Sequence, residues 1–385
     1  MWRHIASNGL TILLVGLVAA AGAVAWAKVE YVAQGPLERA VCLKVEPGSR
    51  MRGISERLAD MGAVRSAGLF RMGADYTDRT KLLKAGSFLL PPGASMDEIT
   101  DLITKGGASS CGVELVYRIK VNGLQAQVRE LDPETDKFEV KAEFEPGVDE
   151  APAEYIAARD DADTRISVVL VEGTTVWQAV EGLKAADFLS GDLGDGLPDE
   201  GSLAPDSYEV RSGADRAELV AKMEAAQAAR LERVWKDRAD ELPVATPAEA
   251  LVLASIIEKE TGLPEERGQV ASVFVNRLNQ GIRLQTDPAV IYGVTGGEGV
   301  LGRGLRRSEL DRETPYNTYT VAGLPPTPIA NPGLAALEAA VNPDSSPFIY
   351  FVADGTGGHA FAETLAEHNK NVAAWRRIER DRANQ

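Results

Sequence analysis

The stretch Leu251-Val252-Leu253-Ala254-Ser255-Ile256-Ile257-Glu258-Lys259-Glu260-Thr261 is an apolar run that ends in two carboxylates. Before it, Thr246-Pro247-Ala248-Glu249 has the pattern of a capping box with proline at the first helical position. Gly262 and Pro264 follow as stop signals. The stretch therefore predicts a helix between Thr246 and Gly262.

The two glutamates at the end of this helix are predicted to lie on different faces. At about 100° per residue, Glu260 shares the apolar face of Leu253, Ile256 and Ile257. Glu258 lies about 200° away from Glu260. Because desolvation raises the pKa of a carboxyl, Glu260 is the one candidate for a proton donor near neutral pH. The alternative is a solvated helix end in which Glu-Lys-Glu forms local charge pairs.

Composition restricts the classes of function. The 385 residues allow two or three domains, and the formal net charge of −16 argues against a nucleic-acid-binding surface. Three histidines and two cysteines show no metal-binding spacing, so we expect neither a metal nor a cofactor. Cys42 and Cys111 can form a disulfide only if the chain is exported, and two unpaired thiols are the alternative.

The N-terminal region contains an uncharged run from Gly9 to Ala27, preceded by Arg3 and followed by Lys28. Its length suits a bilayer, so residues 1–28 are predicted to be a cytoplasmic tip and a transmembrane anchor. The alternative is a cleaved signal peptide, because Ala25-Trp26-Ala27 resembles a cleavage site. Either interpretation exports the rest of the chain.

The remaining chain is predicted to have an α+β fold with three parts. A short stalk over 28–41 leads into a small α+β module over 42–107, which is either a spacer or a carbohydrate-binding module. Residues 108–166 are interpreted as a β-rich insertion, in which the strand-like segments Val113–Val121 and Lys137–Phe144 alternate with acidic loops, and Val168–Val171 is predicted to be the next strand. Residues 167–385 form a mixed α/β catalytic region whose core motifs fall within 246–370.

Two irregular segments after the central helix carry further candidate residues. In Leu284-Gln285-Thr286-Asp287-Pro288, Asp287 is interpreted as a helix N-cap or as a site residue, whereas Gln285 has no such structural reason. Tyr316 and Asn317 lie in a region rich in proline, aromatic and amide side chains. Rings stack on sugar faces and amides bond hydroxyl and acetamido groups, so this region suits sugar recognition.

Six ordered motifs carry a resemblance to a known family. They are Ala254-Ser255-Ile256-Ile257-Glu258-Lys259-Glu260-Thr261, Val273-Phe274-Val275-Asn276-Arg277-Leu278, Leu284-Gln285-Thr286-Asp287-Pro288, Tyr316-Asn317-Thr318-Tyr319, Gly323-Leu324-Pro325-Pro326, and Phe351-Val352-Ala353-Asp354-Gly355 with Gly358-His359. Together they resemble the membrane-anchored endolytic murein transglycosylases, the MltG/YceG-like family. The resemblance implies a lyase of the bacterial inner membrane with a single transmembrane helix, a LysM-like module and a periplasmic catalytic part.

The same resemblance implies a reaction. Enzymes of this kind cleave the β-1,4 bond between N-acetylmuramic acid and N-acetylglucosamine in nascent peptidoglycan strands, which leaves a 1,6-anhydro end and terminates elongation. The family's catalytic glutamate matches Glu260, and cell-wall synthases are expected partners. Gln285, Asp287, Tyr316 and Asn317 would hold sugar groups or orient the acid. The alternatives are a hydrolase that uses Asp287 to activate water, and a non-catalytic glycan-binding scaffold.

Overall fold

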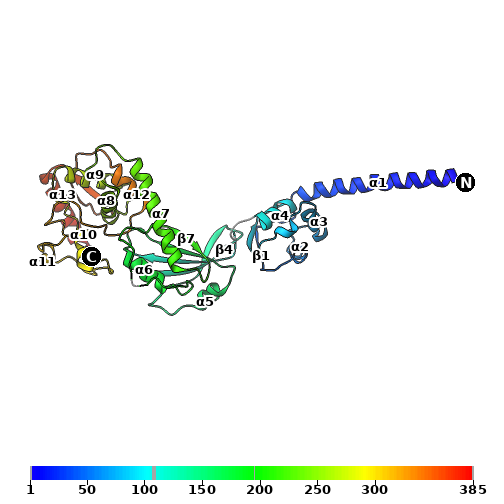
Figure 1. Ribbon diagram of the computed structural model, residues 1–385, viewed down its shortest axis with the longest axis horizontal. Helices are drawn as coiled ribbons and strands as arrows, with labels where there is room; N and C mark the ends of the chain where they lie inside the picture. The colour runs from blue at the N-terminus through cyan, green and yellow to red at the C-terminus, as the bar shows by residue number, and fades with distance from the viewer. Residues whose placement is uncertain (1, 106–109, 195, 384–385) are drawn as a thin grey trace. The chain divides into compact units, whose positions relative to one another are not determined.

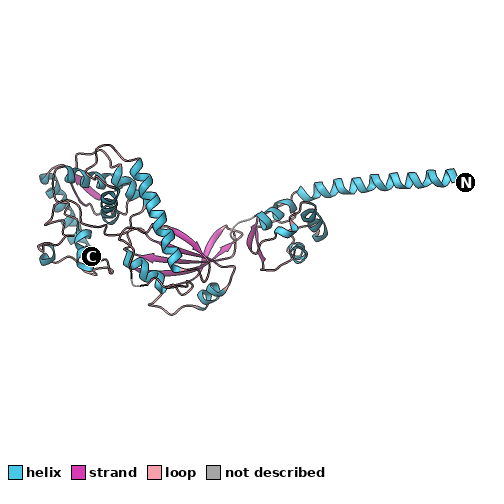
Figure 2. Cartoon of the chain, in the orientation of Figure 1, coloured by secondary structure: helices cyan, strands magenta, loops and turns pink. Residues whose placement is uncertain are grey.

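The structure is a computed structural model that describes residues 2–105, 110–194 and 196–383 (Figure 1). Its fold is mixed α+β, as predicted, with a β-sheet and many helices (Figure 2). The chain divides into two compact units. The first comprises Met1–Leu115, Gln127–Glu143 and Pro152–Arg165, and the second comprises Val116–Ala126, Phe144–Ala151 and Ile166–Gln385.

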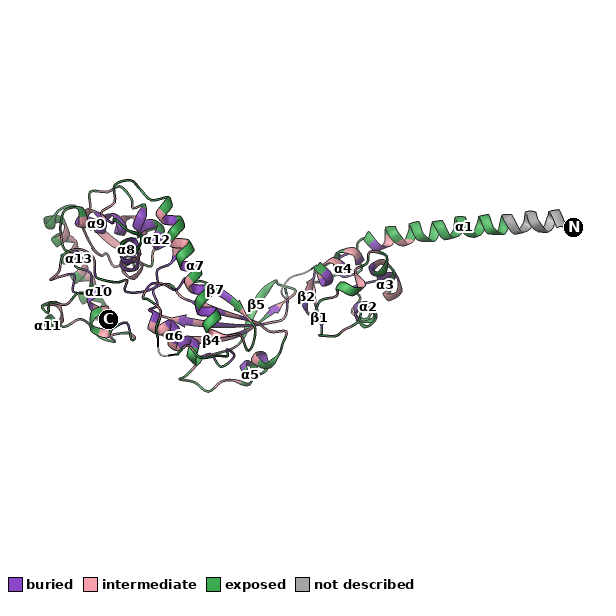
Figure 3. Ribbon diagram, in the orientation of Figure 1, coloured by how far each residue is buried: buried purple, intermediate pink, exposed green. Residues whose placement is uncertain are grey.

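The first unit begins with helix α1, Trp2–Val32, whose segment Thr11–Val32 is long and apolar enough to cross a membrane. Most of its described side chains are exposed (Figure 3). The predicted stalk over 28–41 is wrong in its first part, because the helix continues to Val32. Tyr31 explains the extension: its ring is buried, and its hydroxyl lies 2.6 Å from Thr100 Oγ1 of the following module.

The module after α1 has the alternation of strands and helices that the sequence predicts. Its elements are β1 Val41–Val45, α2 Met51–Asp60, α3 Ala67–Tyr76, the 3₁₀ turn η1 Thr80–Leu82, β2 Gly86–Leu90 and α4 Met96–Lys105. The two strands pair antiparallel, with Val41 opposite Leu90. Ser95 caps the start of α4, because its Oγ accepts a hydrogen bond from the Glu98 backbone N–H.

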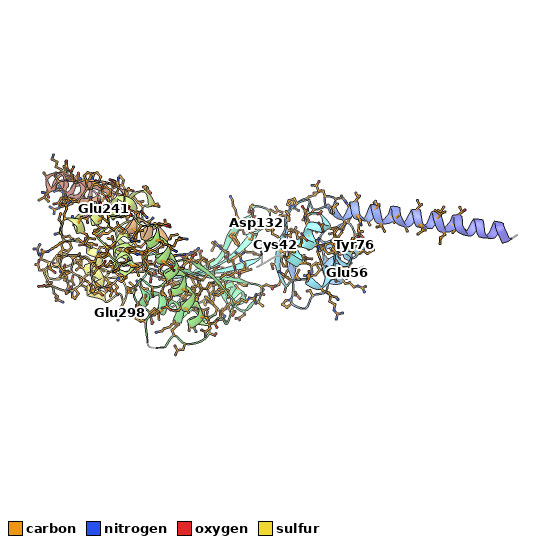
Figure 4. All side chains as sticks on the ribbon, turned by 45° about the horizontal axis from the view of Figure 1, so that its top comes forward. Cys42, Glu56, Tyr76, Asp132, Glu241 and Glu298 are labelled. Carbon is orange, nitrogen blue, oxygen red and sulfur yellow. A yellow bond between two sulfur atoms is a disulfide. The ribbon has the colours of Figure 1, made fainter. Side chains whose placement is uncertain are left out.

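A disulfide joins Cys42 in β1 to Cys111, with the two Cα atoms 5.9 Å apart (Figure 4). This separation lies in the usual range for the bond. Of the two alternatives left open by the sequence, the structure therefore has the paired cysteines. A cross-link of this kind stabilises a small module whose own hydrophobic core is limited.

A five-stranded sheet follows, with strand order β5-β4-β3-β6-β7. Its strands are β3 Val113–Lys120, β4 Gly123–Asp132, β5 Lys137–Phe144, β6 Arg165–Leu170 and β7 Ser207–Val210. The sequence predicted β3, β5 and β6 but missed β4 and helix α5, Ala153–Asp160, in the acidic region. The predicted boundary at residue 166 falls inside β6, because strands on both sides of it hydrogen-bond into one sheet.

The second unit contains the helices that surround the predicted central helix. They are α6 Val176–Ala185, α7 Arg216–Lys236, α8 Pro247–Glu260, η2 Pro264–Glu266, α9 Arg267–Asn279, α10 Asp287–Thr295, α11 Arg307–Leu310, α12 Leu334–Val341 and α13 Leu365–Ala383, with the strand pair β8 Tyr350–Ala353 and β9 His359–Ala362. Helix α8 packs against α7, α9, α10 and α12.

The start and the burial of α8 agree with the sequence analysis. Thr246 is the N-cap, Pro247 is the first helical residue, and Thr246 and Glu249 form the reciprocal capping box. Leu253 and Ile256 are fully buried in a core shared with α9 and α12. The helix therefore ends at a fixed position, and the side chains of its last turn project from a rigid base.

Candidate active site

Glu260, the last residue of α8, is held at the surface of this core. Its side chain is partly exposed, whereas Ile256 and Ile257 on the preceding turn are fully buried. Thr286 Oγ1 donates a hydrogen bond of 2.5 Å to Glu260 Oε1. Among the described residues, no protein group is hydrogen-bonded to Oε2. One oxygen of the carboxyl is thus fixed, and the other is available to a ligand.

The surroundings of Glu260 favour its protonated form. Burial raises the pKa of the Glu260 carboxyl above its usual value, and the hydrogen bond from Thr286 opposes this by stabilising the carboxylate. The negative charge of Asp287 adds to the increase in pKa, while His359 and Arg277 oppose it. The net effect is a raised pKa, which favours the protonated carboxyl.

Glu258 faces a different element. Its Oε2 accepts a hydrogen bond of 3.0 Å from the backbone N–H of Gly333, the N-cap of α12. Burial also raises the pKa of Glu258, so the prediction of a single desolvated acid on this helix is wrong. The predicted separation of the two faces is confirmed, since Glu258 and Glu260 have different partners. Glu258 stabilises the start of α12, where a Cβ on Gly333 would collide with the Glu172 carboxylate.

The loop before α10 contacts Glu260 through Thr286, which lies between the predicted site residues Gln285 and Asp287. Gln285 and Asp287 are exposed, and Thr286 between them is buried. Gln285 has a φ of 52°, a left-handed conformation that is uncommon outside glycine. This turn directs Thr286 to the carboxyl. Thr286 is the N-cap position of α10 and Asp287 its first residue, so the interpretation of Asp287 as the N-cap is wrong.

A second loop supports the first. Thr318 Oγ1 accepts a hydrogen bond from the Thr286 backbone N–H and donates one to the Thr286 carbonyl. Tyr319 donates from its hydroxyl to Asp287 Oδ1 at 2.8 Å. Burial raises the pKa of Tyr319, so its hydroxyl remains a donor. Tyr319 and Thr318 belong to the Tyr316–Tyr319 motif, although the sequence analysis assigned neither of them a role.

Asn317 is in the interior of this second loop. It is fully buried, and its Nδ2 donates to the backbone carbonyls of Glu309, Leu310 and Arg312. Its Oδ1 accepts a hydrogen bond from the Tyr319 backbone N–H. These contacts use the amide to fix the loop that carries Tyr319, which favours the positioning role over sugar contact.

Tyr316 packs against α10 at Tyr292 and Gly293. Its ring lies 5.1 Å from the ring of Tyr292, and its hydroxyl lies 2.7 Å from Thr327 Oγ1 in the proline-rich loop. Gly293 is required here, because a Cβ at that position would lie 2.8 Å from the Tyr316 Cβ. Tyr316 therefore joins α10 to the loop that contains Thr327.

A cavity of about 330 Å³ lies beside Lys259, the residue between the two glutamates. Lys259 Nζ donates to the Gly173 carbonyl at 3.1 Å, and burial lowers the pKa of its ammonium group. Glu200 accepts hydrogen bonds from the Val176 backbone N–H and the Tyr292 hydroxyl, and burial raises its pKa. No local pattern pointed to Glu200, because it is distant along the chain from Tyr292 and Lys259.

The structure thus assembles Glu260, Thr286, Asp287 and Tyr319 in one place, with Gln285 on the adjoining turn. The fold is α+β, and its candidate site places the desolvated carboxyl of Glu260, at the end of α8, beside the polar loop that contains Thr286. The sequence profile of the YceG-like family matches residues 43–374, and the chain belongs to this family.

Several known proteins are similar to the chain. An endolytic murein transglycosylase of Streptococcus pneumoniae serotype 2 (strain D39 / NCTC 7466) is 28% identical over 341 residues, which cover 86% of this chain and 58% of the relative. One from Bacillus subtilis (strain 168) is 43% identical over 120 residues, covering 31% of this chain and 32% of the relative. The chain thus spans less than two thirds of the length of these relatives.

A solved structure is also similar. The crystal structure of a yceG-like protein from Listeria monocytogenes is 24% identical, has a TM-score of 0.46, and covers 86% of this chain and 98% of that one.

Proposed function

We propose that the chain is an endolytic murein lytic transglycosylase. The observation that carries the proposal is the Glu260 carboxyl, which is desolvated, held through Oε1 by Thr286 and, among the residues that the structure describes, not hydrogen-bonded by protein at Oε2. Membership of the YceG-like family and the names of the relatives support glycan strands of peptidoglycan as the substrate. The bond cleaved is the β-1,4 bond between N-acetylmuramic acid and N-acetylglucosamine.

In the proposed reaction Glu260 acts twice. The neutral carboxyl first donates its proton to the glycosidic oxygen, so that the bond from this oxygen to C1 of the muramoyl residue breaks. The resulting carboxylate then removes the proton from the muramoyl 6-hydroxyl while that oxygen bonds to C1. Glu260 ends protonated, as it began, and no water is consumed.

The polar residues around the acid are proposed to hold the sugars. Gln285 and Asp287 are exposed on both sides of Thr286 and would contact hydroxyl or acetamido groups. Tyr316 is proposed to contribute a partly exposed ring, and Asn317 to position Tyr319 through its buried amide. A strained backbone at Gln285 agrees with a functional position.

The location and partners are also proposals. We place α1 in the bacterial inner membrane, with the N-terminus in the cytoplasm and the second unit in the periplasm. The Cys42–Cys111 disulfide supports an oxidising compartment. The module over 42–107 is proposed to be a LysM-like glycan-binding module, and the acidic loops of 108–166 to contact cell-wall synthases.

The test compares two identical substitutions on one helix, Glu260→Gln and Glu258→Gln, in the full chain in detergent with purified glycan strands. The wild type and Glu258→Gln are expected to release 1,6-anhydro fragments, because a glutamine at 258 still accepts the Gly333 hydrogen bond. Glu260→Gln is expected to lower the rate by about 10³-fold or more. It should not lower the unfolding temperature, since it removes a desolvated acid.

Mass spectrometry of the products separates the other outcomes. Fragments heavier by one water would indicate a hydrolase, for which Asp287 is the exposed candidate base. Strand binding without cleavage in the wild type would indicate a scaffold. An active Glu260→Gln variant would remove Glu260 from the mechanism.

A further inference from the structure

His359 and Glu266 form a pair that the proposed mechanism does not use. Glu266 ends η2, shortly after α8, and His359 begins β9. Glu266 Oε1 accepts a hydrogen bond from the His359 backbone N–H at 2.8 Å, and Oε2 lies 2.8 Å from the ring Nδ1. Both side chains are only 16% exposed. One carboxylate therefore fixes both the backbone and the ring of His359.

The packing around the pair leaves little freedom. A Cβ on Gly358 would collide with Glu266 Oε1, so glycine is needed for this approach. The His359 ring meets the ring of Phe351 edge-on at 5.2 Å and lies 6.4 Å from that of Phe361. The imidazole thus has a defined orientation, with a carboxylate on one side and aromatic rings on another.

The hydrogen bond to Glu266 also sets the tautomer. A carboxylate only accepts, so Nδ1 of His359 carries a proton, and in the neutral ring Nε2 is the acceptor. Within the part of the chain that the structure describes, no protein group is hydrogen-bonded to Nε2. A carboxylate that orients a histidine while the other nitrogen faces a reacting group is a recurring catalytic arrangement.

The Glu266–His359 pair lies near Glu260, the proposed acid. His359 is close enough to Glu260 to interact with it electrostatically. The other charged groups around Glu260 are Arg277 from α9 and Asp287 from α10, and Glu266 from η2 contacts His359 directly. Tyr319 is a further titratable group that interacts with Glu260. A Cβ on Gly358 would lie 3.3 Å from Leu263 Cδ1, so the residue before His359 lies against the segment that follows Glu260.

We infer that His359 is a second catalytic residue, whose Nε2 accepts a hydrogen bond from the sugar hydroxyl that attacks C1, with Glu266 as its positioning residue. The inference rests on the proposed function, in which the muramoyl 6-hydroxyl is that group. The hydrogen bond aligns the hydroxyl oxygen with C1 and increases its nucleophilicity. The hydroxyl has one proton, which moves to Nε2 as its oxygen bonds to C1 and is then passed to the Glu260 carboxylate, so Glu260 ends protonated and the balance of the reaction is unchanged.

The kinetic test uses His359→Gln and Glu266→Gln in the full chain in detergent. His359→Gln should lower kcat on purified glycan strands by about 100-fold. Glu266→Gln keeps the backbone hydrogen bond through its carbonyl and turns its NH₂ toward Nδ1. The ring then carries its proton on Nε2, which abolishes the acceptor and should lower kcat with little change in KM.

The folded state of the variants distinguishes this role from a structural one. If His359 acts in catalysis, His359→Gln and Glu266→Gln lower kcat while the circular dichroism spectrum, the unfolding temperature and KM stay near the wild-type values. An unchanged kcat in His359→Gln, or a fall in the unfolding temperature that accounts for the loss of rate, would overturn the inference.

A spectroscopic test does not depend on activity. In ¹⁵N-histidine-labelled full chain carrying Glu260→Gln, the Nε2 resonance of His359, assigned by its loss in His359→Gln, should shift when glycan strands bind. Binding without this shift would overturn the inference. If Glu260→Gln remains active, the proposed function itself fails; if Glu260→Gln is inactive and His359→Gln is normal, only this inference fails.

Discussion

Glu260 owes its protonation behaviour to residues from other elements. Its own helix supplies the buried turn beneath it, but the hydrogen bond comes from Thr286, and the charges that oppose its rise in pKa come from His359 and Arg277. Glu258, two residues earlier, is also desolvated, yet it faces a backbone N–H of α12. These partners distinguish Glu260, the proposed proton donor, from Glu258, which stabilises the start of α12.

At this scale we expect Asp287→Asn to change the pH dependence of cleavage. The Asp287 charge raises the pKa of Glu260, so its removal lowers that pKa. Glu260 must be protonated to act, and a lower pKa reduces the protonated fraction at a given pH. The limb at which activity falls with rising pH should therefore move to lower pH, measured as kcat/KM against pH.

The matched control is Asp240→Asn, an exposed aspartate of the same unit. It changes the net charge equally but should leave the profile in place. In Asp287→Asn, the new side-chain amide still offers a carbonyl oxygen to the Tyr319 hydroxyl, so a loss of the loop is not expected. A limb that stays in place in Asp287→Asn would show that Asp287 does not act on Glu260.

Among the elements, buried amides fix the loops that surround α8. Asn331 is fully buried between the end of β6 and the start of α12. Its Nδ2 donates to the Thr174 carbonyl at 3.0 Å, and its Oδ1 accepts a hydrogen bond from the Leu203 backbone N–H at 2.9 Å. Asn317 has the same kind of role in the loop that carries Tyr319. Both loops thus depend on one internal side chain each.

We expect Asn331→Ala to lower the free energy of unfolding of the second unit by about 2–4 kcal/mol. It removes two buried hydrogen bonds and leaves the Leu203 backbone N–H without its partner, whereas the Thr174 carbonyl keeps its hydrogen bond from the backbone N–H of residue 331. Asn342→Ala is the matched control, because Asn342 is exposed and donates one hydrogen bond to the Asp237 carbonyl. That change should stay within about 1 kcal/mol. Equal effects of the two substitutions in thermal unfolding would contradict the role of Asn331.

At the scale of the whole molecule, the last turns of helix α1 join it to the small module that follows. Helix α1 continues without a break to Val32, and the Tyr31 ring packs against α3 at Gly73. A Cβ at Gly73 would collide with that ring. The exposed Tyr76 of α3 also lies beside Lys28, whose Nζ is 5.0 Å from its ring (Figure 4). The module therefore packs against the end of α1.

Gly73→Ala is expected to weaken the packing of the module against the end of α1. Alanine favours a helix over glycine by up to about 1 kcal/mol, but here the methyl group would displace the Tyr31 ring. Gly53→Ala is the control, because Gly53 lies in α2 with open space around it. We expect Gly53→Ala to raise the unfolding temperature in detergent and Gly73→Ala to lower it. Hydrogen exchange should increase at α1 and α3 in Gly73→Ala only. Equal exchange in both variants would contradict a stabilising contact between Tyr31 and Gly73.

The sequence alone determined the elements whose signals are local. The capping box at Thr246, the apolar periodicity of α8 and the long uncharged run of α1 each lie within a few turns of chain, so their helices and faces could be predicted. The choice of Glu260 over Glu258 followed from the same periodicity. Strand β4 was missed although Leu124, Ala126 and Val128 alternate with polar residues, which is the pattern of a half-buried strand. Helix α5 was missed because its acidic residues resemble those of a loop.

Only the tertiary structure decided which groups meet. The Thr286 hydrogen bond, the Tyr319 contact with Asp287, the Glu266–His359 pair and the Cys42–Cys111 bond join residues from different elements. Such contacts depend on how loops pack, and hydrogen bonds form only within a few tenths of an ångström of the right distance. A local pattern specifies a helix and its faces, but it does not specify what a side chain at the end of that helix will touch.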